Sequence, residues 1–287
     1  MLRELSLFGD VSAPSSTQLN LSSASQIRDA VTDSGAHLVV NCAAYTAVDH
    51  AETESELAEL VNHHAVAQMA TSCVATGATL VHFSTDYVFG DMGGQPMTED
   101  HRANPLGVYG RTKLQGEQAI ANSGCAHLNF RTSWVYASRG KNFLLTMLRL
   151  AESQPALRIV NDQWGAPTPA RLIASAAVHC LARAGVIGTL PSRINEVQGT
   201  YHLCAAGYTT WHGFAAEIFR LREQLTGLTA PSLEAISTAQ FPTPARRQAN
   251  SRLQLDRLTT QFGLHMPDWQ QALAPVVSEA VRDLLRN

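Results

Sequence analysis

Tyr109 and Lys113 are the residues whose types and spacing most directly suggest chemistry. They stand four positions apart at the start of a stretch, 112–120, whose pattern predicts a helix, so both side chains should project from one face. A phenol exchanges its proton poorly near neutrality because its unperturbed pKa is about 10. A neighbouring ammonium stabilises the phenolate and lowers that pKa, so the pair could donate or accept a proton during a reaction.

The elements before this pair bear on whether it is catalytic or a chance pair on a surface helix. The apolar run 80–83 predicts a buried parallel strand, which places Ser84, Thr85 and Asp86 at its C-terminal end. Open α/β sheets bind their ligands at that end. The Thr85 hydroxyl could hydrogen-bond a substrate carbonyl there. This order of strand, hydroxyl and Tyr/Lys helix favours the catalytic interpretation.

Several segments between positions 40 and 253 resemble the dTDP-4-dehydrorhamnose reductase family of extended short-chain dehydrogenases/reductases. They are 40–49, 84–89, 108–113, 130–136, 161–168, 242–247 and 250–253. The resemblance implies an α/β fold, a Rossmann-like doubly wound parallel sheet with a smaller C-terminal substrate domain. Residues 1–155 would form the dinucleotide-binding domain. Residues 156–287 would form mainly the sugar-nucleotide domain, with some segments returning to the Rossmann core.

The resemblance also implies an activity and a set of site residues. The activity is reduction of the C4 ketone of dTDP-4-dehydro-L-rhamnose by NADPH or NADH, with Tyr109, Lys113 and Thr85 as the catalytic residues. Cofactor contacts would come from Asn20, Leu21, Ala44, Tyr45, Thr46, Phe83, Tyr109 and Lys113. Substrate contacts would come from Thr85, Asp86, Trp134 and Arg246. For the last two, a half-buried aromatic and an arginine on a solvated turn are the plainer alternatives.

The N-terminal residues depart from this family. Residues 5–10 are expected to form a short strand ending in Asp10, in the place of the second strand of a dinucleotide-binding fold. Gly9 is the only glycine before Gly35, so the sequence lacks the glycine-rich turn that cradles a pyrophosphate. A start site assigned too far downstream, a truncated product and a diverged relative would each explain this, and we favour the first. Asn20 and Leu21 also stand where the family usually carries an acid and an aromatic.

Composition narrows the classes of partner and compartment. The formal net charge of −3 and the lack of a basic run disfavour nucleic acid and anionic membrane as partners. The five cysteines show no Cys-x-x-Cys spacing, which suggests reduced thiols in a cytoplasmic protein. No apolar stretch is long enough for a membrane helix. A homodimer is an open expectation.

No metal ion is expected. Members of the family can pair through magnesium held by glutamates, one of them in a first helix that this sequence lacks, so that site is not carried over. His63 and His64 are adjacent and are expected not to share a helix face. With no carboxylate or cysteine at ligand spacing, we interpret them as polar helix positions.

Two other functions stay open from the sequence. One is another sugar-nucleotide epimerase or dehydratase, although a dehydratase normally carries an acid pair after the threonine, where this chain has Asp86-Tyr87-Val88. The other is a non-catalytic regulatory subunit, because the regulatory β subunit of methionine adenosyltransferase resembles the same family. Retention of Thr85, Tyr109 and Lys113 favours chemistry, and the missing glycine-rich turn favours the regulatory alternative.

Overall fold

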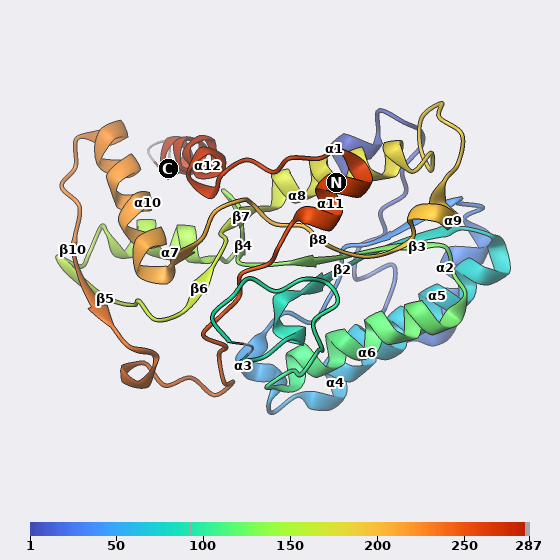
Figure 1. The fold of residues 1–287 in the computed structure, drawn as a ribbon, viewed down its shortest axis with the longest axis horizontal. Helices are drawn as coiled ribbons and strands as arrows, with labels where there is room; N and C mark the ends of the chain where they lie inside the picture. The colour runs from blue at the N-terminus through green and yellow to red at the C-terminus, as the bar shows by residue number, and fades with distance from the viewer. Residues whose placement is uncertain (92, 285–287) are drawn as a thin grey trace.

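A four-stranded parallel sheet lies at the centre of the fold in the computed structural model, which describes residues 1–91 and 93–284 (Figure 1). The strand order is β1 (Leu38–Asn41), β2 (Thr79–Thr85), β3 (His127–Thr132) and β8 (Gly199–His202). Leu80 and Val81 of β2 are fully buried, as expected of a strand covered on both faces. The structure confirms the predicted α/β class and the parallel sheet.

Helices cover both faces of this sheet (Figure 1). On one face α2 (Ala24–Asp33), α5 (Ala65–Thr76) and α6 (Val108–Ser123) form an apolar cluster with β2. On the other face α8 (Ala170–Arg183) and α11 (Asp256–Phe262) pack against β2, β3 and β8. Burial from both sides accounts for the apolar residues Leu80 and Val81 of β2 and Leu128 and Phe130 of β3.

A second apolar cluster lies beside the sheet, on the left in Figure 1. It joins α7 (Phe143–Leu150), α10 (Trp211–Thr226) and α12 (Trp269–Leu284) to the parallel pair β5 (Ala156–Val160) and β10 (Ser232–Ile236). The domain boundary between residues 155 and 156 stays a prediction. The remaining elements are α1 (Leu2–Leu5), α3 (Val48–Ala51), α4 (Ser55–Glu59), η1 (Leu60–His64), η2 (Asp86–Val88), β4 (Val135–Tyr136), β6 (Trp164–Gly165), β7 (Thr168–Pro169), α9 (Ile194–Val197), β9 (Thr209–Thr210) and η3 (Thr238–Gln240).

The expected strand over residues 5–10 is wrong. Leu5 ends the short helix α1 and is buried in the cluster around α8, whereas Leu7 is 80% exposed. A strand needs a neighbouring strand for its backbone groups, and none lies beside this segment in the described chain. Asp10 is exposed in a stretch without regular structure. Within the described residues β1 pairs on one edge only, with β2.

The expectation that His63 and His64 do not share a helix face is also wrong. Residues Leu60–His64 form a single π-helical turn, in which the backbone N–H of Ala65 bonds to the carbonyl of Leu60, five residues earlier. This wider turn brings both histidines near the carboxylate of Glu59. No helix in the described part of the chain combines the length and apolarity needed to cross a membrane.

Candidate active site

The end of β2 and the start of α6 bring Thr85 and Tyr109 together. The Thr85 hydroxyl accepts the N–H of Tyr87 at 3.2 Å and so caps the turn η2 that follows the strand. Gly110 lets α6 approach this turn closely, because a Cβ there would lie 2.2 Å from the Tyr87 carbonyl oxygen. The rings of Tyr109 and Tyr87 then pack in a T-shaped arrangement, with their centroids 5.5 Å apart. The close approach explains why a glycine follows the tyrosine.

Tyr109 is a protonated phenol in this arrangement. Burial raises the pKa of Tyr109 above its usual value, and a hydrogen bond with the Thr85 side chain opposes that rise. The direction is opposite to the lowered pKa that the sequence suggested. The cause is burial, and Lys113, which was expected to stabilise the phenolate, donates to the Phe83 carbonyl.

Lys113 is fully buried one turn further along α6. Its Nζ donates to the carbonyl oxygen of Phe83 at 2.7 Å and lies 3.1 Å from Nε2 of His82. Burial lowers the pKa of Lys113 to about 8, and the nearby carboxylate of Glu117 opposes that shift. An ammonium group held inside the protein by neutral partners is poised to lose its proton just above neutral pH.

His82 and Asn41 extend this network across two neighbouring strands. The N–H of Ala43 donates to Asn41 Oδ1, which turns the Asn41 amide nitrogen toward His82 Nδ1 at 3.1 Å. His82 Nδ1 therefore accepts and its Nε2 carries the proton. That N–H points at Lys113 Nζ, and only a neutral amine can accept it. The hydrogen-bond geometry thus agrees with the lowered pKa of Lys113.

Sequence reasoning missed His82 and Asn41 as members of the site. His82 was counted within an apolar strand, yet it is 1% exposed and burial holds its pKa well below the usual value. His82 is a polar position inside a predicted buried strand, and Asn41 lies in the segment 40–49 that resembles the family. The first signal could have identified His82, since a buried polar group needs a partner.

The loop after β1 also reaches this region. Asn62 accepts the N–H of Tyr45 at 2.9 Å and donates to its carbonyl at 3.1 Å, which fixes the loop of Ala44, Tyr45 and Thr46. The Tyr45 ring packs in one small apolar cluster with Tyr109. The structure therefore brings the predicted cofactor loop next to the predicted catalytic tyrosine.

Asn20 and Leu21 make their contacts with α2 and the cluster around it. The Asn20 N–H is held by the Gln26 side chain, and Leu21 packs against the cluster around α2 and α5. In the described part of the chain neither residue has a hydrogen bond or ring contact with Tyr109. Their role in cofactor binding stays a prediction.

Asp86 is buried beside Thr85, and its carboxylate oxygens have partners within the protein. Oδ1 accepts the Thr85 hydroxyl at 3.1 Å and Oδ2 accepts Nε2 of Gln248 at 2.9 Å. Burial raises the pKa of Asp86 to about 6, and hydrogen bonds from Ser251, Thr85 and Gln248 oppose the rise. Sequence reasoning did not assign Gln248 or Ser251 to the site, although Ser251 lies in the segment 250–253 that resembles the family.

Trp134 stacks on Trp211, with ring centroids 3.6 Å apart and planes 7° from parallel. Its backbone has a φ of 47°, which is uncommon for a bulky residue. Gly165 lies under the indole, because a Cβ there would come within 2.4 Å of the ring. Trp134 is half-buried, so part of its surface can still receive a ligand.

Arg246 and Arg247 differ in their surroundings. Arg246 is exposed and pairs with Asp91 at 2.6 Å. Arg247 is half-buried, pairs with Asp49 at 2.7 Å and donates to the Tyr87 hydroxyl at 3.2 Å, next to Tyr109. Both line a cleft of about 460 Å³. A diphosphate in this cleft would compete with the carboxylates for the two guanidinium groups.

The residues present fit one half of a nicotinamide dinucleotide. Lys113, Tyr109 and Thr85 offer an ammonium and two hydroxyls at the C-terminal end of a parallel strand, which suits a ribose and its ring. The Phe83 carbonyl accepts a hydrogen bond from Lys113 at 2.7 Å, and its role in cofactor binding stays a prediction. For the pyrophosphate half of the cofactor, this sequence does not contain the glycine-rich turn that usually binds it.

The comparisons with known proteins agree with this geometry. Residues 2–282 match the sequence profile of a family described as RmlD substrate binding domain. A dTDP-4-dehydrorhamnose reductase of Salmonella typhimurium is 45% identical over 243 residues, which cover 84% of this chain and 79% of the relative. One from Burkholderia thailandensis is 42% identical over 291 residues, covering 99% of this chain and 94% of the relative.

Solved structures with similar folds carry the same name. A dTDP-4-dehydrorhamnose reductase ortholog from Clostridium acetobutylicum superposes with a TM-score of 0.84 at 30% identity, covering 99% of this chain and 95% of the other. The dTDP-4-dehydrorhamnose reductase of Bacillus anthracis, solved in complex with NADP, gives a TM-score of 0.82 at 30% identity, covering 94% and 90%.

Proposed function

Because the chain belongs to the RmlD substrate binding domain family, we propose that it reduces the C4 ketone of dTDP-4-dehydro-L-rhamnose to dTDP-L-rhamnose with NADPH or NADH. Relatives at 42–45% identity are named for this substrate, and a structural neighbour holds NADP. The observation that carries the proposal is the pairing of the Tyr109 phenol with Thr85 at the end of β2, one helical turn from a buried Lys113.

Tyr109 would donate its hydroxyl proton to the ketone oxygen, and Thr85 would do the same after turning its own hydroxyl away from Asp86, to which it donates in this structure. When bound, NADPH or NADH supplies the hydride that the ketone carbon receives. The oxygen then becomes an alkoxide and takes the Tyr109 proton, which the raised pKa keeps on the phenol at neutral pH. Lys113 would bind the ribose next to the nicotinamide through its amino group, which donates to the Phe83 carbonyl in this structure.

The substrate contacts belong to the same proposal. Trp134 would contact the sugar with its free surface, and Asp86 would orient Thr85 through their hydrogen bond as well as contact the sugar. Arg246 would hold the diphosphate, in the cleft it shares with Arg247. A cytoplasmic location, supported by five free cysteines, and a homodimer complete it.

Tyr109→Phe tests the chemistry directly. The variant keeps the ring contacts but lacks the proton, so turnover, followed as loss of NADPH absorbance with dTDP-4-dehydrorhamnose, should fall by about 10²–10⁴-fold. Tyr208→Phe is the matched control and should retain activity, because its hydroxyl donates to the Leu253 carbonyl and has no other hydrogen bond among the described residues. Unchanged turnover in Tyr109→Phe would refute the assignment. A wild-type chain that neither binds NADPH nor turns over would favour the regulatory-subunit alternative.

A further inference from the structure

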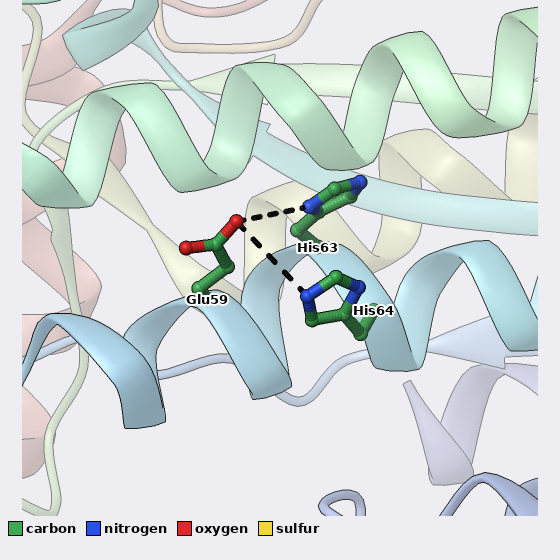
Figure 2. Close-up of side chains that lie close together, drawn as sticks. All are labelled: Glu59, His63 and His64. Carbon is green, nitrogen blue, oxygen red and sulfur yellow. Dashed lines mark ion pairs between the residues drawn. The ribbon is translucent and has the colours of Figure 1, made fainter.

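A cluster of three metal-ligating side chains lies outside the site described above. Glu59, His63 and His64 project toward one another from a single stretch of helix, with the dashed contacts of Figure 2 converging on one carboxylate oxygen. That oxygen, Oε1, lies 3.6 Å from His63 Nδ1 and 4.0 Å from His64 Nε2. We propose that this cluster is a binding site for a borderline divalent transition metal, Zn²⁺ first among them.

The π-helical turn is what creates the convergence. In an α-helix, residues five apart point about 140° away from each other, since each residue advances about 100°. The π turn over Leu60–His64 closes five-residue hydrogen bonds instead, so His64 comes back over Glu59. His63 already shares that face because it lies four residues from Glu59. The two imidazoles stack at 4.5 Å beside the carboxylate.

The distances are close to those a bound ion needs. Zinc bonds of about 2.0–2.2 Å to nitrogen and oxygen place tetrahedral ligand atoms roughly 3.3–3.5 Å apart. All three ligand atoms here lie within 4.8 Å of one another, so closure requires a movement of about an ångström. His64 is 58% exposed and is free to make it. Three protein ligands would leave a fourth position for water.

The donor atoms are not engaged elsewhere in the described structure. His63 Nδ1 is buried and has no hydrogen-bond partner, which is costly for a polar atom. Two imidazoles and one carboxylate favour zinc, copper or nickel, whereas magnesium and calcium require mostly oxygen ligands. By contrast, His50 and Glu54 make an ordinary pair at 3.8 Å, and the residues that the structure describes place no second histidine beside them.

A bound ion would also stabilise the loop next to Tyr109. Asn62 belongs to the same π turn, holds the Tyr45 backbone by two hydrogen bonds, and donates to Thr112 in α6 at 3.2 Å. Clamping Glu59 to His63 and His64 fixes the turn that presents this asparagine. A ligand that binds only the folded chain raises its unfolding temperature, so zinc should do so here.

The test is metal titration of the full chain, free of any histidine tag and stripped with chelator. Zn²⁺ should bind one equivalent per chain in competition with a chromophoric chelator, and Co²⁺ at the same site should give visible d–d absorption. His64→Ala and Glu59→Gln should each weaken binding by at least about tenfold, since even outer-shell partners of a metal contribute that much. Both should also lose most of the zinc-induced rise in unfolding temperature.

His50→Ala is the matched control and should bind like the wild type. His63→Ala completes the set, but the ring is partly buried, so the exposed His64 and Glu59 variants carry the decision if that protein fails to fold. No zinc binding in the wild type, equal affinity in wild type and His64→Ala, or an equal loss in His50→Ala would each overturn the proposal.

Discussion

Lys113→Met should stabilise the protein at neutral pH while abolishing its activity. The structure lowers the pKa of Lys113 from 10.5 to about 8 by burial. A shift of about 2.5 pKa units corresponds to roughly 3 kcal/mol spent on keeping the ammonium inside at pH 7. Methionine removes that cost but leaves the Phe83 carbonyl without its donor, a loss of about 1–3 kcal/mol. The net gain in free energy of unfolding is then about 0–2 kcal/mol at pH 7.

The pH dependence of the free energy of unfolding tests whether the stabilisation comes from removing a buried charged lysine. Between pH about 8 and 10.5 the unfolded chain binds more protons than the folded one, so wild-type stability rises with pH by up to roughly 3 kcal/mol. The Lys113→Met protein lacks this rise. Its advantage at pH 7 should therefore turn into a deficit of about 0–2 kcal/mol at pH 10, where the unfolded lysine is still mostly protonated.

Urea unfolding followed by tryptophan fluorescence at pH 7, 8, 9 and 10 measures both proteins under identical conditions. Other groups that titrate in this range, such as the buried tyrosines, cancel in the difference between them. Parallel stability curves would refute the buried, proton-losing lysine. In the wild type, kcat/KM for the cofactor should also decline above pH about 8, because it reports the free enzyme.

Three more predictions concern substitutions of charged residues around the site. Glu117→Gln leaves the Arg131 guanidinium buried without its partner and should lower the free energy of unfolding by about 3–5 kcal/mol, whereas methionine at both positions should recover most of it in urea unfolding. Asp86→Asn should remove the fall in stability that the raised pKa of about 6 imposes on the wild type between pH 3.8 and 6, measured by thermal unfolding. Arg246→Ala should raise KM for the dTDP-sugar about tenfold with kcat unchanged. The same effect in Arg247→Ala alone would move the diphosphate contact to that residue.

Much of the fold and part of the site could be predicted because their signals are local. The apolar run before Ser84 and the Tyr-x-x-x-Lys spacing each report an element and the face it presents. The family resemblance built on such segments is confirmed, as is the Rossmann-like sheet. The catalytic, cofactor and substrate roles of individual residues stay predictions.

The misses come from interactions that a linear pattern does not encode. Gln248 reaches Asp86 across 162 positions, and His82 meets Lys113 across 31, so neither pairing leaves a periodic trace. The π turn over Leu60–His64 has no sequence pattern of its own by which it could be predicted. The short apolar run at Leu5 was read as a strand, because so few residues carry no distinct period.

The hydrogen-bond network around Lys113 disfavours the charged form of this lysine in the folded protein. Asn41 fixes the tautomer of His82, and His82 then faces the lysine with an N–H that a charged ammonium cannot accept. A charged Lys113 is therefore opposed by burial and by its neighbour at once. His82→Gln offers a carbonyl oxygen that can accept from the ammonium, so the pKa of Lys113 should rise and the alkaline fall in kcat/KM should move to higher pH. An unchanged pH profile with intact folding would show that His82 only fills space behind the lysine.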